Sequence, residues 1–134
     1  MISLQSGLAA LLALVSGALF AADLPLEQIK LPPGFSIEVW TRIDNPRQMA
    51  LGRHDERGGT LFVGSMQAGK VHAVRYGADF KAGSTTTVAS DLARPVGVAY
   101  QDGRLYVSAI NRILRFDDIE QRRAARLEVR VRRV

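Results

Sequence analysis

Short apolar segments alternate with glycine-containing turns along this chain, and the same pattern occurs twice. Residues 61–63 (LFV) are followed 44 positions later by residues 105–107 (LYV). Each copy has a short apolar strand, a break of small residues and a second strand that ends in an aromatic residue. The preceding segments also match, residues 46–51 (PRQMAL) against 95–100 (PVGVAY). A repeat of about 40 to 50 residues built from short strands is typical of β-propeller blades.

The alternation within both copies predicts antiparallel β-structure. We expect strands over residues 34–40, 48–51, 61–64, 71–76, 85–89, 96–100, 104–108 and 113–116. Residues 52–59 are predicted to be an exposed hairpin loop, and LEQI (residues 26–29) suits one helical turn. Asp102-Gly103 favours a tight hairpin turn. The predicted fold class is therefore all-β, with about two and a half blades of a propeller at this repeat length.

The first 22 residues have the pattern of a secretory signal peptide. Residues 7–22 are apolar and no charged residue precedes Asp23. The run is shorter than the roughly 20 residues that cross a bilayer, so we expect no stable membrane span. This pattern predicts a signal-peptide helix over residues 1–22 and a periplasmic or secreted protein.

The net charge of +5 belongs to the C-terminal tail. Residues 122–134 contain six arginines and one glutamate, while the acids and bases of the other 121 residues balance. The body therefore has no charge signature of nucleic-acid binding. The tail contains no third repeat. Residues 119–126 suit a helix capped by Asp117 or Asp118, and residues 127–132 alternate like a strand. The chain contains no cysteine, which excludes disulfides and thiolate metal sites.

Few residues carry recognisable chemistry. Residues 64–70 (GSMQAGK) nearly match a phosphate-binding loop, but Val71 stands where that loop needs a hydroxyl, and a strand-like segment follows. A hairpin is the favoured interpretation. His54 and His72 are single imidazoles with no carboxylates at ligand spacing, so we assign neither a metal nor a catalytic role. Asp117 and Asp118 suit a solvated turn or cap better than a cation site. No GxSxG nucleophile motif occurs.

The candidate binding residues are chosen by position. Propeller ligands bind at one end of the central channel, beside the loops that enter the innermost strands. Arg47, Gln48 and Arg94 lie at the entry to such strands in the two copies, and Asn111 lies in a turn of the second copy. The alternative is that all four are ordinary polar residues of loops.

Several consecutive blocks resemble a known family. Residues 23–40 (DLPLEQIKLPPGFSIEVW), 46–52 (PRQMALG), 61–74 (LFVGSMQAGKVHAV) and 96–120 (VGVAYQDGRLYVSAINRILRFDDIE) look like the N-terminal part of the L-sorbosone dehydrogenase-like proteins. These are a branch of the PQQ-dependent sugar dehydrogenases. Over residues 23–121 the resemblance implies a secreted or periplasmic six-bladed propeller. PQQ and Ca²⁺ would lie over its channel, where sugars or related aldehydes transfer hydride to the quinone with a histidine as general base.

The resemblance stops before the residues that would perform this oxidation. In the family, the catalytic histidine and most cofactor contacts lie on blades beyond the position matching Glu120, and neither His54 nor His72 falls in that context. No catalytic residue is therefore carried over. A truncated or frame-shifted reading frame would explain residues 122–134. We expect an N-terminal fragment of a quinoprotein oxidoreductase that is inactive alone; the alternatives are a non-enzymatic NHL-type binding module and a Ca²⁺-dependent lactonase-type hydrolase.

Overall fold

The computed structural model describes residues 24–121 and 132–133, which belong to two units, Met1–Glu38 and Val39–Val134. In the described part of the first unit, Leu26–Gln28 form a single 3-10 turn, η1, as expected for LEQI. Residues 34–40 form no strand, so that prediction is wrong. The alternating Phe35, Ile37 and Val39 are 70%, 42% and 38% exposed, and no described strand pairs with them. The predicted signal peptide lies outside the described residues.

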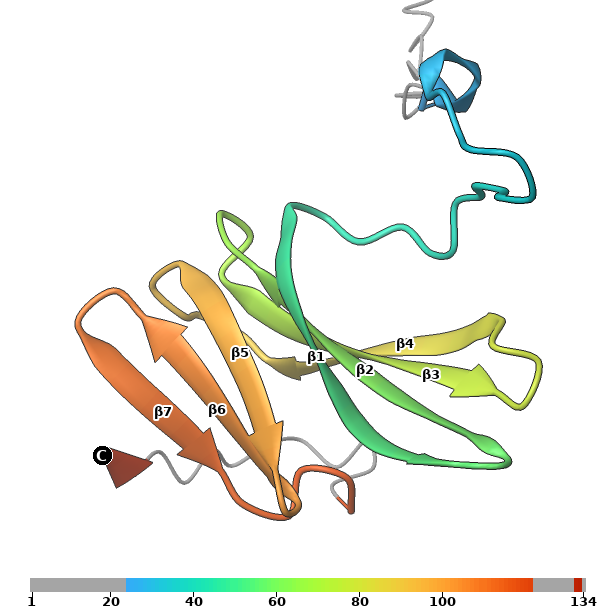
Figure 1. Ribbon diagram of the computed structural model, residues 1–134. Helices are drawn as coiled ribbons and strands as arrows, with labels where there is room; N and C mark the ends of the chain where they lie inside the picture. The colour runs from blue at the N-terminus through green and yellow to red at the C-terminus, as the bar shows by residue number, and fades with distance from the viewer. Residues whose placement is uncertain (1–23, 122–131, 134) are drawn as a thin grey trace, which may run out of the picture. The chain divides into compact units, whose positions relative to one another are not determined.

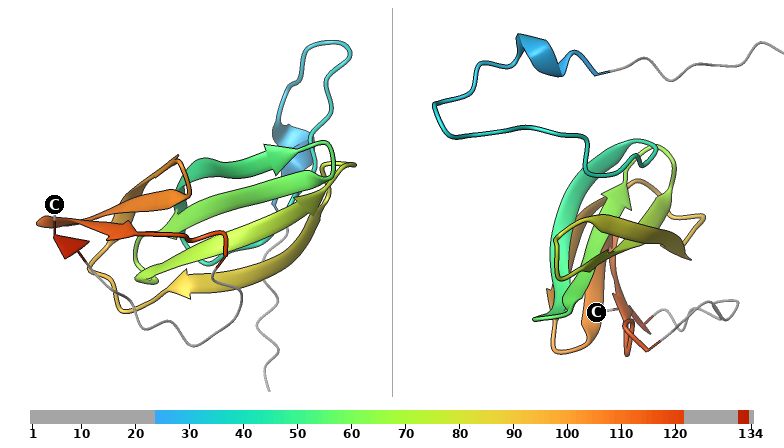
Figure 2. Two further views of the ribbon diagram at one scale, coloured as in Figure 1. Left: turned by 90° about the horizontal axis from the view of Figure 1, so that it is seen from below. Right: turned by 90° about the vertical axis from the view of Figure 1, so that its right-hand side faces the viewer.

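The second unit contains two antiparallel sheets (Figure 1). The first sheet has the order β1-β2-β3-β4, and the second has the order β5-β6-β7-β8. Their strands are β1 (Pro46–Asp55), β2 (Gly58–Ser65), β3 (Lys70–Gly77), β4 (Ala82–Ala89), β5 (Pro95–Gln101), β6 (Arg104–Ala109), β7 (Arg112–Phe116) and β8 (Arg132–Arg133). The all-β prediction is confirmed, and neither sheet is closed. The strands of the first sheet fan out from β1 to β4, as the natural twist of a sheet requires (Figures 1 and 2).

Tight turns join the strands within each sheet. Asp102 and Gly103 have φ of 48° and 80°, which is the left-handed pair of a type I′ hairpin turn, as predicted. Residues 66–69 form the turn between β2 and β3, with Gly69 at φ 65°. The segment that nearly matched a phosphate-binding loop is thus a hairpin and opens no helix.

The predicted loop over residues 52–59 is wrong in extent. β1 continues to Asp55 and β2 begins at Gly58, so the turn between them is short. The two glycines are needed by the sheet rather than by a loop. A Cβ on Gly58 would lie 2.0 Å from the carbonyl oxygen of Tyr76, and one on Gly59 would lie 2.6 Å from the Tyr76 hydroxyl. Glycine therefore permits the close approach of β3 at this point.

The two sheets pack face to face, with β1 beside β5 (Figure 2). The Phe62 and Tyr100 rings stack across the interface with centroids 5.7 Å apart. A Cβ on Gly64 would lie 2.7 Å from the carbonyl oxygen of Pro95, so glycine allows the second sheet to approach closely. The core consists of buried apolar residues from both sheets, among them Phe62, Val71, Val98, Leu105, Val107, Leu114 and Phe116.

Corresponding strands pair in the same register in the two sheets, which supports the sequence repeat. Leu61 pairs with Leu51 on β1, and the corresponding Leu105 pairs with Tyr100 on β5. Both first strands also carry a one-residue irregularity near their start. In β1 it falls between Pro46 and Gln48, and in β5 it falls between Pro95 and Val98. Each sheet is therefore a copy of the same structural unit.

The residues after β7 return to the first sheet. Asp117–Gln121 are turns rather than the start of the predicted helix, whose remaining residues lie outside the described part. Ile119 is only 3% exposed and its amide donates to the carbonyl oxygen of Gly103 at 3.1 Å. The carboxylate of Glu120 accepts hydrogen bonds from the Arg53 amide at 2.7 Å and the Thr60 hydroxyl at 3.0 Å. This segment ties the second sheet to the β1–β2 hairpin.

Candidate functional site

The four candidate binding residues lie at one end of the two stacked sheets, which we call the entry end because β1 and β5 begin there. Arg47 and Gln48 lie at the start of β1, and Arg94 directly precedes β5. Asn111 lies in the β6–β7 turn, which returns to the same end because β6 is antiparallel to β5 (Figure 1). The fold thus places all four at the same level, as their positions in the repeat suggested.

The backbone before β1 and β5 has the same unusual conformation in both copies. Asn45 precedes Pro46 with φ of 50°, and Arg94 precedes Pro95 with φ of 47°. Asparagine tolerates this left-handed region, whereas arginine does so at a cost of roughly 1–3 kcal/mol. Such strain collects at binding sites, as do β-bulges of the kind that follow each proline. The sequence contains no signal for the conformation of Arg94.

Arg47 and Gln48 have different neighbours. Arg47 lines a pocket of about 310 Å³ together with Trp40, Met49 and Val63. This pocket lies on the side of the first sheet that faces away from the second sheet. The amide oxygen of Gln48, in contrast, lies beside Gly97 of β5, where an added Cβ would approach it to 3.4 Å. Gln48 therefore reaches β5.

Arg94 and Asn111 are both exposed at the entry end. Between Asn111 and β6 lies Ile110, a β-branched residue with φ of 37° and 75% exposure. Sequence reasoning missed it, because nothing in an Ile-Asn turn marks an isoleucine as left-handed. An exposed, strained apolar residue beside a candidate ligand position is unusual, since such a conformation favours glycine.

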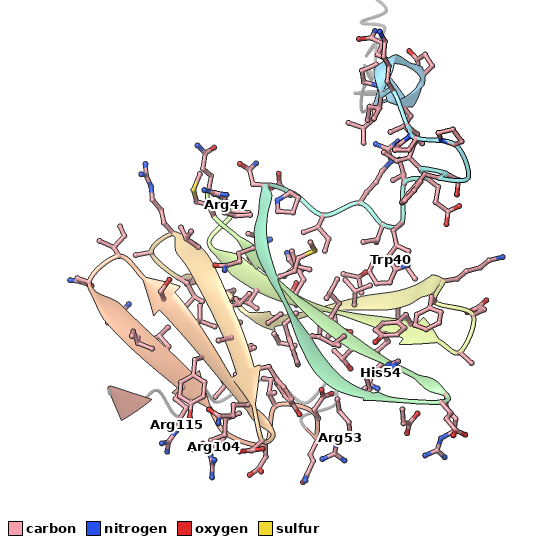
Figure 3. The ribbon with its side chains drawn as sticks, in the orientation of Figure 1. Trp40, Arg47, Arg53, His54, Arg104 and Arg115 are labelled. Carbon is pink, nitrogen blue, oxygen red and sulfur yellow. The ribbon has the colours of Figure 1, made fainter. Side chains whose placement is uncertain are left out.

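The two histidines lie at different levels of the first sheet, and His72 is level with Met49 because both pair with Val63. His54 lies near the opposite end of β1, where its Nδ1 is 2.9 Å from the Tyr76 hydroxyl (Figure 3). His72 Nδ1 is 3.3 Å from the Thr87 hydroxyl on β4, and its buried Nε2 has no hydrogen-bond partner in the described part of the chain. Burial, and then the Lys70 ammonium, lowers the pKa of His72 below its ordinary value of 6.5, while Asp44 opposes the shift. Both rings have structural partners on the first sheet.

The charged residues at the other end form local pairs. Arg115 Nε lies 3.0 Å and Arg104 Nε 3.6 Å from the same oxygen of Asp117. Figure 3 shows Arg53, Arg104 and Arg115 near one end of the sheets and Arg47 near the other. Asp117, a candidate for a cap or a solvated turn, thus holds two arginines together. Within the described residues no three histidines, aspartates or glutamates gather into a metal-binding group.

Comparison with known proteins gives one distant relative. An uncharacterized protein of Borreliella burgdorferi is 29% identical to this chain over 100 residues, which are 75% of this chain and 24% of that protein. The chain thus spans about a quarter of the length of the curated relative it matches. No protein-family model matches the chain. No solved structure matches it either. No helix in the described residues is long and apolar enough to span a membrane.

Proposed function

We propose that this chain forms two blades of a β-propeller of the PQQ-dependent sugar dehydrogenase type, exported to the periplasm or secreted. In this proposal its entry end contributes contacts to a ligand site shared with further blades. The observation that supports this proposal is that the two sheets repeat one structural unit. Both sheets begin with a left-handed residue, a proline and a bulged strand at the same end. Blades of a propeller present repeated loops to a common channel in this way.

The entry-end residues suit an anionic ligand. PQQ carries carboxylates, and arginine binds a carboxylate with two parallel hydrogen bonds. Arg94 supplies the cation, while Gln48 beside β5 and Asn111 supply amides at the same level. Arg47 is tied less closely to β5, because it lines a pocket with Met49 and Val63 of the first sheet. When bound, PQQ would supply the hydride acceptor, and these residues would only orient it.

The described residues do not fit a bound Ca²⁺, because no group of acidic side chains gathers at the entry end. The imidazole of His72 lies near this end, level with Met49, but on the face of the first sheet that points away from the second sheet. His54 and His72 are engaged with Tyr76 and Thr87 on the first sheet. We therefore assign no oxidation step to this chain and propose that it binds without catalysing.

Calorimetric titration of PQQ into the purified chain tests this proposal. Arg94→Ala should weaken binding by about tenfold or more, since a hydrogen bond to a charged group contributes roughly 1.5–3 kcal/mol. Arg53→Ala is the matched control, because it removes the same charge at the opposite end of the sheets (Figure 3). Equal losses in both variants would indicate non-specific charge attraction. A folded chain with no PQQ binding would favour the NHL-type binding module.

A further inference from the structure

One face of the first sheet is apolar and only partly covered. This face, which we call the free face, contains Met49, Leu51, Leu61 and Val63 and points away from the second sheet. Met49 is 62% and Leu51 is 55% exposed on β1, whereas Val63 on β2 is only 2% exposed, so the open part of the face lies over β1. Trp40 covers the part over β3, where its ring meets Tyr76 at 6.0 Å and its Nε1 donates to the carbonyl oxygen of Phe80 at 2.5 Å.

Two pockets open on the free face. One, of about 350 Å³, is lined by Trp40, Leu51 and Phe80 among others, and the second, of about 310 Å³, is lined by Met49 and Val63. Their linings are mostly apolar side chains. Large exposed apolar surfaces of this kind mark interaction sites in soluble proteins.

The repeat shows which kind of protein surface packs on such a face. By strand register, the free-face residues correspond to positions on the second sheet that pack against the first: Met49 to Val98, Leu51 to Tyr100, Leu61 to Leu105 and Val63 to Val107. Val98, Leu105 and Val107 are at most 6% exposed. The packing of the second sheet on the first therefore shows how a face of this kind is buried.

In this packing, the second sheet is covered by the opposite face of the first sheet. This covering surface presents Ala50, Phe62, Gly64 and Val71. The corresponding positions on the second sheet are Ala99, Tyr106, Ser108 and Ile113. They form its outer face, on which Ile113 is 49% exposed. Like the covering surface, this outer face combines small residues with one aromatic ring. Two of its arginines, Arg104 and Arg115, share the carboxylate of Asp117.

We propose that copies of this chain associate head to tail, with the outer face of the second sheet of one copy packed on the free face of the next. Each copy carries both halves of this interface, and the contact repeats the stacking already present between its own two sheets. A head-to-tail contact closes into a ring when its rotation divides a full turn. Propellers hold about four to eight blades, which corresponds to about two to four copies of this two-sheet chain. The expected copy number rests on the proposed propeller, whereas the interface itself does not depend on PQQ binding.

Native mass spectrometry and light scattering of the full chain test the assembly. We expect a discrete oligomer of about two to four copies of the 14.6 kDa chain. Leu51→Glu on the free face and Ile113→Glu on the outer face should each abolish it. Ala78→Glu, an exposed change in the β3–β4 connection, should leave the mass unchanged. Circular dichroism and thermal melting would establish that the variants are folded.

Mixing the two variants distinguishes this interface from a symmetric one. The Leu51→Glu chain keeps an intact outer face and the Ile113→Glu chain keeps an intact free face, so the mixture should form a one-to-one heterodimer and nothing larger. Emission from Trp40, the single tryptophan, should shift to the blue as that dimer forms. A wild-type monomer at all concentrations would overturn the proposal. So would a mixture of folded variants that stays monomeric, or an oligomer that both substitutions leave intact.

Discussion

A carboxylate oxygen of Glu120 lies 2.7 Å from the amide nitrogen of Arg53, a residue 67 positions earlier in the chain. Its second oxygen accepts a hydrogen bond from the Thr60 hydroxyl, which is part of a residue only 3% exposed. Gly52 leaves room for this contact, since a Cβ there would lie 2.5 Å from the same carboxylate. The end of the described repeat is thus bound to the first hairpin by a specific set of groups.

Glu120→Ala should lower the free energy of unfolding by about 1–3 kcal/mol, because it leaves the Thr60 hydroxyl without its acceptor. Urea denaturation followed by circular dichroism measures this change. Glu56→Ala, an exposed glutamate in the β1–β2 turn, is the control and should change stability by less than about 0.5 kcal/mol. Equal effects of the two substitutions would contradict the role of Glu120.

Arg94→Gly should stabilise the chain by about 1 kcal/mol, because glycine adopts the left-handed backbone of this position without a steric penalty. The gain is reduced by the greater freedom of glycine in the unfolded chain. Thermal melting measures the balance. Ala93→Gly, the neighbouring exposed position without a positive φ, should instead destabilise the protein. Destabilisation by both would show that Arg94 is not strained.

Gly64→Ala should destabilise the protein by about 1–3 kcal/mol, because the new methyl group would meet the Pro95 carbonyl and force the sheets apart. Gly83→Ala provides the comparison, since its added carbon comes no nearer than 3.3 Å to the Arg75 carbonyl oxygen. We expect only a small change there. A neutral Gly64→Ala would mean that the two sheets are less closely packed than described.

Acid should destabilise the fold through His72. Its pKa in the folded chain is lowered by burial from the ordinary 6.5, so the unfolded state binds more protons as the pH falls. This contribution to stability is complete above about pH 6.5 and is lost as the pH falls through that value toward the folded pKa. Unfolding free energies measured between pH 7.5 and about 5 should fall with pH. His72→Gln should flatten the curve.

The repeat and the antiparallel hairpins could be predicted from the sequence because they depend on local alternation and on turn residues such as Asp102-Gly103. The strand ends at Gly58 and Gly59 could not be predicted, because glycine is required there by the close approach of Tyr76 on a neighbouring strand. The pattern of residues 34–40 was misleading because alternation makes a strand only where a partner is present.

The level at which the candidate residues lie could be predicted from the repeat, but the backbone irregularities beside them could not. The repeat indicated that Arg47, Gln48, Arg94 and Asn111 share one end of the sheets. The irregularity after Pro46 leaves Arg47 without a partner in the register of β2, and no sequence signal marks it. The backbone of Arg94 and the Glu120 contacts likewise depend on residues distant in the chain.

The measurement that tests the central claim most directly is sugar oxidation by the purified chain supplied with PQQ and Ca²⁺. Reduction of an artificial electron-accepting dye, with sorbosone or an aldose as substrate, reports hydride transfer to the quinone. Because His54 and His72 contact Tyr76 and Thr87 on the first sheet, we expect PQQ to bind without any dye reduction above the rate of free PQQ. Turnover at the rate of an intact dehydrogenase would contradict the claim that this chain supplies only part of the propeller.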